Sequence, residues 1–209
     1  MTDQSVYIGF MITKEQILFA AGQVFSQVGY SQSTIQDIAT AAEIGKGTVY
    51  SFFESKPEIL FEACRVHIDF CKSEMEEFKK IAGFTLSQKI EKLLEYFILQ
   101  IIPNQSKSCF LFYELLVLAA TDKNYQGRIA ELLRSRQIFT EKVFMDYYEE
   151  GLATGEFHSL DNPLEFIRSF TSSVDGLIFQ YSFRADDLFL EKQLAYEQFK
   201  FRAILFKGK

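Results

Sequence analysis

A chain of 209 residues, 48% of them hydrophobic, is long enough to bury one substantial core or two smaller ones, which excludes a disordered protein. Its formal net charge of −6 excludes a broad positive surface, so any binding to nucleic acid must depend on a few local donors. Three cysteines without secretory features favour a reduced, cytoplasmic setting, and the longest apolar runs are far too short to span a membrane.

Apolar residues recur at helical spacing along most of the chain, and no stretch alternates with period two for long enough to indicate a strand. The sequence therefore predicts an all-α fold of about nine helices. These helices should occupy residues 13–28, 33–42, 46–53, 55–81, 85–101, 109–120, 124–151, 162–181 and 187–206. Residues 1–12 lack a clear period and should form a short arm. Thr13 with Gln16, and Thr85 with Gln88, are spaced as capping boxes that start two of the helices.

Residues 33–56 are the most informative stretch, because they predict two short helices joined by a tight turn. Ser33 and Gln36 are spaced as a capping box for the first helix. Gly45 and Gly47 mark the junction, where the chain must turn sharply and where a missing Cβ lets a phosphate approach. The second helix should turn two sets of side chains in opposite directions: Val49, Phe52 and Phe53 inward, and Thr48, Tyr50 and Ser51 outward. This pattern is typical of a helix-turn-helix, whose second helix presents the reading face.

Three pieces of this region, TIQDIATAA, IGKGTVYSFFESK and EIL, resemble the DNA-binding signature of the TetR (tetracycline-repressor-like) family of bacterial transcription regulators. The resemblance implies an all-helical homodimer with three N-terminal helices that bind operator DNA and a larger domain that dimerises and takes up an inducer. It divides the chain into the arm, residues 1–12, a DNA-binding domain, residues 13–54, and a ligand-binding and dimerisation domain, residues 55–209. Glu43 departs from the family pattern, which usually has glycine at this position.

The resemblance and the outward-facing side chains together give the residues expected to contact DNA: Ser33, Thr34, Lys46, Gly47, Thr48, Tyr50, Ser51 and Lys56. Lys46 and Lys56 should reach phosphates, and the hydroxyl groups should reach base edges. Through residue 56 the chain carries three lysines against five acidic residues, a net charge of −2. Because one such head attracts DNA weakly, we expect two heads to act together in a dimer.

The chain beyond residue 55 is rich in phenylalanine and contains no tryptophan. Aromatic residues with a few polar anchors are expected to line a pocket for a hydrophobic small molecule, and ordinary core packing is the alternative. The expected ligand-binding residues are His67, Phe70, Phe97, Phe112, Tyr113, Leu116, Arg136, Phe139, Phe170 and Val174. The long helix that starts at Ser55 should act as a lever that transmits ligand binding to the head.

Cys64, His67 and Cys71 share one helical face and could bind a soft metal ion with Cys109 as the fourth ligand. Packing in the core is the interpretation that we expect, so the sequence assigns no metal and no other cofactor. No nucleophile–base pair, phosphate-binding loop or carboxylate metal motif is present in the sequence, which argues against an enzyme.

The last two expected helices resemble the pair that meets across the dimer axis in this family, although burial within one subunit is the alternative. The expected interface residues are Ile167, Phe170, Val174, Leu177, Ile178, Tyr181, Leu194 and Phe201. The sequence thus predicts a cytoplasmic, ligand-responsive regulator, usually a repressor, that binds a palindromic operator as a homodimer and is released by a hydrophobic small molecule. The alternative is a helical ligand-carrying or metal-sensing protein with weak or no DNA binding.

Overall fold

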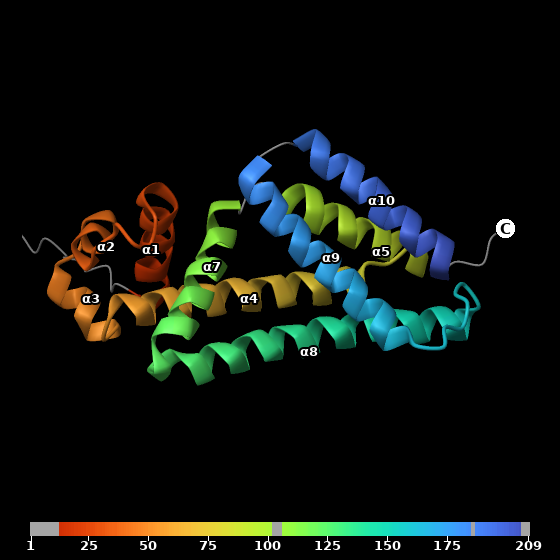
Figure 1. Cartoon of the computed structure of the whole chain (residues 1–209), viewed down its shortest axis with the longest axis horizontal. Coiled ribbons are helices and arrows are strands. Elements are labelled where there is room, and N and C mark those ends of the chain that lie inside the picture. Colours follow the sequence, from red (N-terminus) through yellow and green to blue (C-terminus); the bar gives the residue numbers. More distant parts are fainter. Residues whose placement is uncertain (1–12, 102–105, 185–186, 206–209) are drawn as a thin grey trace, which may run out of the picture. The chain divides into compact units, whose positions relative to one another are not determined.

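The computed structural model describes residues 13–101, 106–184 and 187–205, and these residues are almost entirely helical. They form nine α-helices and one short π-helix, which confirms the predicted all-α fold (Figure 1). The predicted arm, residues 1–12, lies outside the described residues. The chain divides into two compact units, unit 1 over residues 1–63 and unit 2 over residues 64–209. The functional division expected at residue 55 stays a prediction, because one helix contributes residues to both units.

Unit 1 contains α1 (Lys14–Val28), α2 (Ile35–Ala41), α3 (Lys46–Phe52) and the start of α4 (Lys56–Lys80). The predicted capping box starts α1, because the Thr13 hydroxyl accepts from the amide of Gln16 while the Gln16 side chain accepts from the amide of Thr13. The core of unit 1 combines small, branched and aromatic apolar side chains, including Ile17, Ala21, Ile38, Ala39, Val49 and Phe53.

An ion pair with one buried partner joins the two ends of unit 1. Glu62 on α4 is buried, and its carboxylate accepts a hydrogen bond from the Lys14 ammonium of α1 at 2.9 Å. The same ammonium lies 5.2 Å from the centre of the Phe53 ring, where a cation–π contact adds to the pairing. Because the Glu62 carboxylate is buried and needs a hydrogen-bond donor, its pairing with the half-exposed Lys14 ties α1 to the start of α4.

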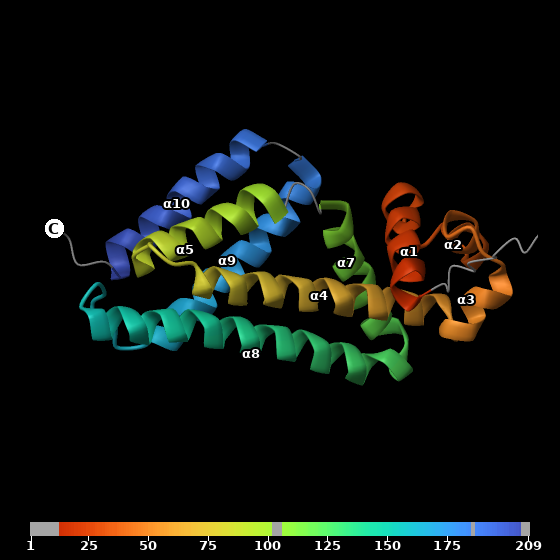
Figure 2. The ribbon, with the colours of Figure 1, turned by 180° about the vertical axis from the view of Figure 1, so that it is seen from behind.

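Unit 2 contains the rest of α4 and five further helical segments with short connections. These are α5 (Leu86–Glu95), continued by the π-helix η1 (Tyr96–Ile101), α7 (Ser106–Thr121), α8 (Lys123–Thr154), α9 (Pro163–Arg184) and α10 (Asp187–Leu205). Helix α8 packs on α7 and α9, and α10 packs on α5, on η1 and on α9. Figures 1 and 2 show α5 and α10 side by side from both directions. None of the described helices combines the length and the apolar composition needed to cross a membrane.

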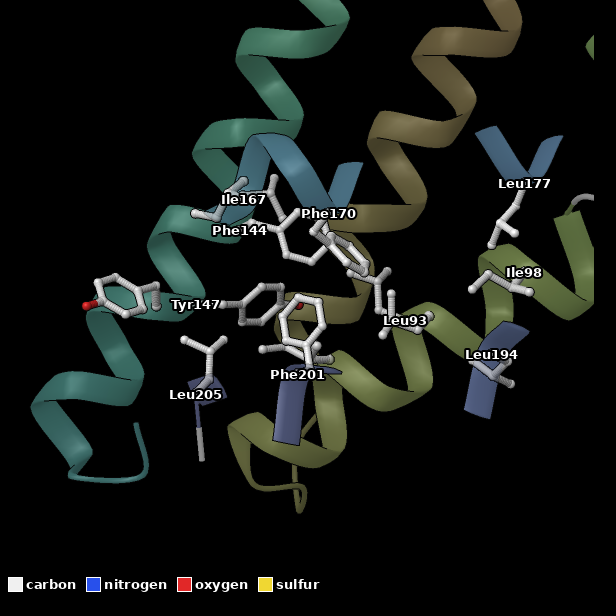
Figure 3. Packing of buried hydrophobic residues seen from close by; sticks show 14 of the residues in the cluster. Leu93, Ile98, Phe144, Tyr147, Ile167, Phe170, Leu177, Leu194, Phe201 and Leu205 are labelled. Carbon is white, nitrogen blue, oxygen red and sulfur yellow. The ribbon is translucent and has the colours of Figure 1, made fainter. Parts of the chain in front are cut away.

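Three phenylalanine rings from three helices form the centre of the unit 2 core (Figure 3). The Phe170 ring of α9 lies 4.4 Å from the Phe201 ring of α10 and 5.3 Å from the Phe144 ring of α8, all in edge-to-face geometry or close to it. Such pairs contribute roughly 0.5–1.5 kcal/mol each beyond the area that they bury. The aromatic content of the sequence therefore serves, at least here, to hold α8, α9 and α10 together.

Two glycines shape the end of α8: Gly155 caps the helix, and Gly151 lies against a buried ring. Gly155 has a left-handed backbone (φ 77°) and caps the helix. The chain then folds back, so that the Phe157 amide donates to the Gly151 carbonyl at 3.0 Å and the Phe157 ring covers Gly151. A Cβ at residue 151 would meet ring carbons of Phe157 at 2.1–2.4 Å, so only glycine fits there without a shift of the ring.

Candidate functional site

Helix α3 presents the face that the sequence predicts for DNA reading. Lys46, Gly47, Tyr50 and Ser51 are exposed and Thr48 is half-buried. On the opposite face Val49 and the capping residue Phe53 are buried against the core of unit 1. The inward orientation predicted for Phe52 is wrong, because its side chain is 40% exposed. The exposed edge thus carries one ammonium group, hydroxyl groups and two aromatic rings.

The turn between α2 and α3 is built differently from the prediction. Glu43, and neither glycine, has the left-handed backbone (φ 56°). Its amide donates to the Thr40 carbonyl at 3.1 Å, and the Ile44 amide donates to the Ala39 carbonyl at 2.9 Å, which together make a Schellman motif at the end of α2. Gly45 is instead an extended N-cap residue with φ −74°. The turn therefore depends on the position where the resembling family usually has glycine.

The start of α2 also differs from the prediction by one residue. The capping box is formed by Thr34 and Asp37, each of which accepts from the amide of the other, at 3.2 and 2.8 Å. The predicted partner Ser33 is buried, and its hydroxyl donates to the Tyr30 carbonyl at 2.7 Å. Ser33 therefore holds the loop together, and its buried side chain cannot reach DNA, which corrects the prediction. The Thr34 side chain is exposed.

Lys56, another predicted DNA contact, already has partners within unit 1. Its ammonium donates to the carbonyls of Tyr30 and Ser33, each at 2.8 Å, and lies 4.4 Å from the centre of the Tyr30 ring. These bonds tie the start of α4 to the loop before α2, so the ammonium is used inside unit 1. Lys46, by contrast, is exposed and lies 5.8 Å from the Tyr50 ring on its own helix.

Unit 2 contains a cavity of about 840 Å³ between α4, α5, η1, α7, α8 and α9. Eight of the ten predicted ligand-binding residues line it: His67, Phe97, Phe112, Tyr113, Leu116, Arg136, Phe170 and Val174. Phe70 does not line the cavity, because its side chain is exposed on α4. Phe139 is also outside the lining, and the Lys72 ammonium lies 5.7 Å from its ring. The prediction that Phe70 and Phe139 line the ligand cavity is therefore wrong.

Sequence reasoning missed much of the cavity wall. Missed residues include Ile68, Met75, Leu93, Leu94, Thr140, Phe144, Arg168, Thr171 and Asp175. The apolar ones belong to the helical stripes from which the core was predicted, so periodicity marked them as buried without showing that they face an open space. Asp175 and Arg168 carried no signal, since a charge on an amphipathic helix normally indicates a solvated face.

The polar part of the cavity is centred on an ion pair. The Arg136 guanidinium donates to both carboxylate oxygens of Asp175, at 3.1 and 2.8 Å. Burial alone lowers the pKa of Arg136, but the hydrogen bonds and charge of Asp175 outweigh it, so the pKa is raised. Burial, with the Arg136 charge as a second cause, lowers the pKa of His67, whose ring stacks edge to face on Phe112 at 5.6 Å. His67 is therefore neutral at neutral pH and can act as a hydrogen-bonding group.

The two described cysteines hold neutral thiols. Burial raises the pKa of Cys64 to about 12 and that of Cys71 to about 11. The Cys71 sulfur lies 3.7 Å from Nε2 of His67, whereas the Cys64 thiol donates to the Leu111 carbonyl at 3.8 Å. Across residues 13–101, 106–184 and 187–205, no three His, Cys, Asp or Glu side chains are grouped so that they could hold a metal ion. The side chain of Cys109 lies outside the described residues.

Most of the predicted dimer-interface residues lie in the core of the chain itself. Ile167, Phe170, Leu177, Tyr181, Leu194 and Phe201 are buried in unit 2, and Val174 packs against the same cluster. The six buried side chains cannot contact a second copy, which corrects the prediction for them. Val174 is partly buried, and the Ile178 side chain lies outside the described residues. The exposed apolar residues of α9 and α10 are different ones: Phe179, Tyr196, Phe199 and Ile204. Phe179 is 49%, Tyr196 57% and Phe199 63% exposed.

Comparisons with known proteins agree with this geometry. Residues 17–63 match the family model described as "Bacterial regulatory proteins, tetR family". The HTH-type transcriptional regulator YerO of Bacillus subtilis is 28% identical over 73% of this chain, and the matched segment spans 56% of YerO. The transcriptional repressor KstR2 of Mycolicibacterium smegmatis is 23% identical over 76% of this chain and 75% of KstR2. A TetR transcription regulator from Haloarcula marismortui shares the fold, with a TM-score of 0.78 and 17% identity over 91% of this chain and 97% of that one.

A three-helix head in which α3 is exposed, followed by a larger helical unit with a cavity, is the arrangement of a helix-turn-helix regulator of transcription. Residues 17–63 carry the DNA-binding domain of the TetR family of bacterial transcription regulators, and the chain shares the fold of a TetR regulator of known structure. This confirms the predicted class of protein, a DNA-binding regulator and not an enzyme.

Proposed function

We propose that this chain is a cytoplasmic repressor that binds a palindromic operator as a homodimer and is released when a hydrophobic small molecule enters unit 2. The cavity of about 840 Å³ carries this proposal, because α4 lines it with five residues and the same helix begins in unit 1. The sign of regulation follows KstR2, which is a repressor.

The proposed DNA contacts are the exposed residues of the predicted set: Thr34, Lys46, Gly47, Thr48, Tyr50 and Ser51. Lys46 contacts a phosphate, and Thr48 and Ser51 contact base edges. Of the three lysines between residues 13 and 56, Lys14 is paired with Glu62 and Lys56 bonds to two carbonyls. Lys46 is then the lysine of the head that is left for DNA, so tight binding needs two heads on one operator.

The proposed dimer surface is the exposed side of α9 and α10. Phe179, Tyr196, Phe199 and Ile204 give this side apolar side chains, while the buried side of the same helices holds the core. Aromatic side chains are enriched at the centre of protein interfaces, where they bury large areas at low entropic cost. A two-fold axis through this side would place the same residues of both copies against each other.

Release of DNA is a shift between two populations of the dimer. The cavity wall includes His67, Cys71 and Met75 of α4, so a ligand that fills the cavity contacts this helix directly. Operator binding needs one particular spacing of the two reading helices, in successive major grooves. A ligand that binds better to another position of α4 lowers the population with that spacing, by no more than its difference in affinity.

Fluorescence anisotropy with the DNA upstream of its own gene tests the proposal. The protein should bind this DNA with an affinity that falls steeply with salt, and Lys46→Gln should reduce the slope of log K against log salt by about two, because a dimer carries two copies. Lys142→Gln removes the same charge from an exposed position on α8 and should leave the slope unchanged. Absence of binding at low salt would contradict the proposal and favour a helical ligand-carrying protein.

A further inference from the structure

The cavity of unit 2 is unusually cationic for a chain of net charge −6. Four of its lining residues are basic, Lys72, Arg134, Arg136 and Arg168, and among the lining residues Asp175 is the acidic one. The cavity wall thus carries an excess of positive charge although the whole chain is negative, so the excess is a property of this wall.

Two of these four cations are already neutralised. Arg136 donates to both oxygens of Asp175, and Arg168 pairs with Glu141 and with Glu165, each at 3.0 Å. A carboxylate outside the cavity therefore compensates Arg168, and the lining carboxylate compensates Arg136. Neither arginine leaves an unmatched charge for a ligand to neutralise.

The other two cations have no carboxylate partner within the described parts of the chain. The Lys72 ammonium lies 3.5 Å from the Ser135 hydroxyl oxygen and 5.7 Å from the Phe139 ring. Arg134 precedes Ser135 on α8 and makes no hydrogen bond or ion pair with any residue that the structure describes. Lys72 and Arg134 thus give the cavity two positive charges, and neither forms an ion pair with a carboxylate of the described residues.

The cavity also changes in polarity from its rim to its interior. Arg134 is exposed and Lys72 is half-buried, so both ammonium and guanidinium groups lie where water reaches the cavity. Other parts of the wall are apolar and buried, with Leu93, Leu94 and Phe170 among their residues. A ligand that fits both parts has an apolar body and a polar head at one end.

We propose that the inducer is an amphipathic anion, with its apolar body in the interior and a carboxylate or phosphate head between Lys72 and Arg134. Both cations donate to anionic oxygens, and charge-assisted hydrogen bonds of this kind are stronger than neutral ones. The cavity volume of about 840 Å³ is in the range of sites that enclose a whole small ligand. The inference rests on the proposed function, because it names the ligand class for the same cavity.

Displacement of Nile red, a neutral apolar dye, from the full-length protein tests the inference. Dodecanoate, dodecyl phosphate, dodecanol and dodecylammonium carry the same chain with different heads, below their micelle-forming concentrations. We expect the two anions to compete about tenfold more strongly than dodecanol, and dodecylammonium to compete least. The tighter of the two anions identifies the head as a carboxylate or a phosphate.

A pair of double variants separates the specific cations from general charge. Lys72→Gln with Arg134→Gln should remove the advantage of the anions and leave dodecanol unchanged. Lys123→Gln with Lys142→Gln, two exposed positions on α8 outside the cavity lining, removes the same total charge and should preserve the advantage. Equal competition by dodecanol and the anions in the unchanged protein would overturn the inference but not the proposed function. Failure of Nile red and of every probe to bind would overturn both.

Discussion

Replacing Glu43 tests how the turn of the helix-turn-helix is held. Glu43 has φ 56°, a left-handed backbone that costs a residue with a Cβ roughly 1–2 kcal/mol. Glycine adopts this conformation freely but loses about 0.5–1 kcal/mol more conformational entropy on folding. We therefore expect Glu43→Gly to raise the free energy of unfolding by about 0.5–1 kcal/mol, which corresponds to about 2–4 °C in Tm per kcal/mol for a chain of this size.

The negative charge of Glu43 has a separate effect on DNA binding. The residue is exposed at the end of α2, next to the turn that leads into the reading helix α3. Its loss should tighten binding at low salt, and the gain should shrink as salt screens the charges. Glu43→Gln removes the charge but keeps a Cβ in the left-handed region, and Glu43→Asn removes the charge and tolerates that region better.

Thermal unfolding and DNA anisotropy on the three variants then give different orders. Stability should rise from the parent and Gln, which are similar, through Asn to Gly, whereas all three variants should gain a similar, salt-sensitive amount of DNA affinity. Equal stabilisation by Gln and Gly would refute the backbone explanation. A gain in affinity for Gly alone would show that turn geometry, and not charge, limits DNA binding.

Three further predictions follow from the geometry of unit 2. Gly151→Ala should destabilise the fold by about 1–2 kcal/mol in urea unfolding, because the new Cβ would overlap the Phe157 ring. Gly127→Ala on the same helix is the control: its Cβ meets no atom within 4 Å, so it should stabilise the fold by about 0.5–1 kcal/mol. Equal effects of the two substitutions would contradict the close contact. Alkylation of Cys71 by iodoacetamide, followed by peptide mass spectrometry, should be slow at pH 8 and should become faster up to about pH 11, since the raised pKa of about 11 keeps the thiol protonated below that pH. Cavity ligands should slow the alkylation. A labelling rate that does not change with pH would contradict the raised pKa. Phe199→Asp should yield a monomer in analytical ultracentrifugation, while Ile138→Asp, at a similarly exposed position on α8, should leave the dimer intact. A dimer in both variants would exclude the proposed surface.

The capping boxes show how far local sequence signals reach. The boxes predicted at Thr13 and Thr85 are present, because the two partners of each box are three residues apart and need no distant contact. At the start of α2 the same spacing occurs twice in succession, at Ser33 and at Thr34. The packing of Ile35 and Ile38 in unit 1 sets the phase of this helix, so Thr34 caps it and Ser33 is buried. Local pattern alone could not choose between the two.

The sequence by itself determined the helical fold, the position of α3 and the class of protein, because helical periodicity and a contiguous motif act over short separations. It could not decide which apolar residues of α9 and α10 pack inside the chain, since both sides of these helices carry them. It also could not show that Lys56 bonds to two carbonyls of the loop between α1 and α2. Nor could it show that Lys72 and Arg134 line one cavity without carboxylate partners in the described chain. These outcomes depend on contacts between residues more than 20 positions apart, which only the packing of helices brings together.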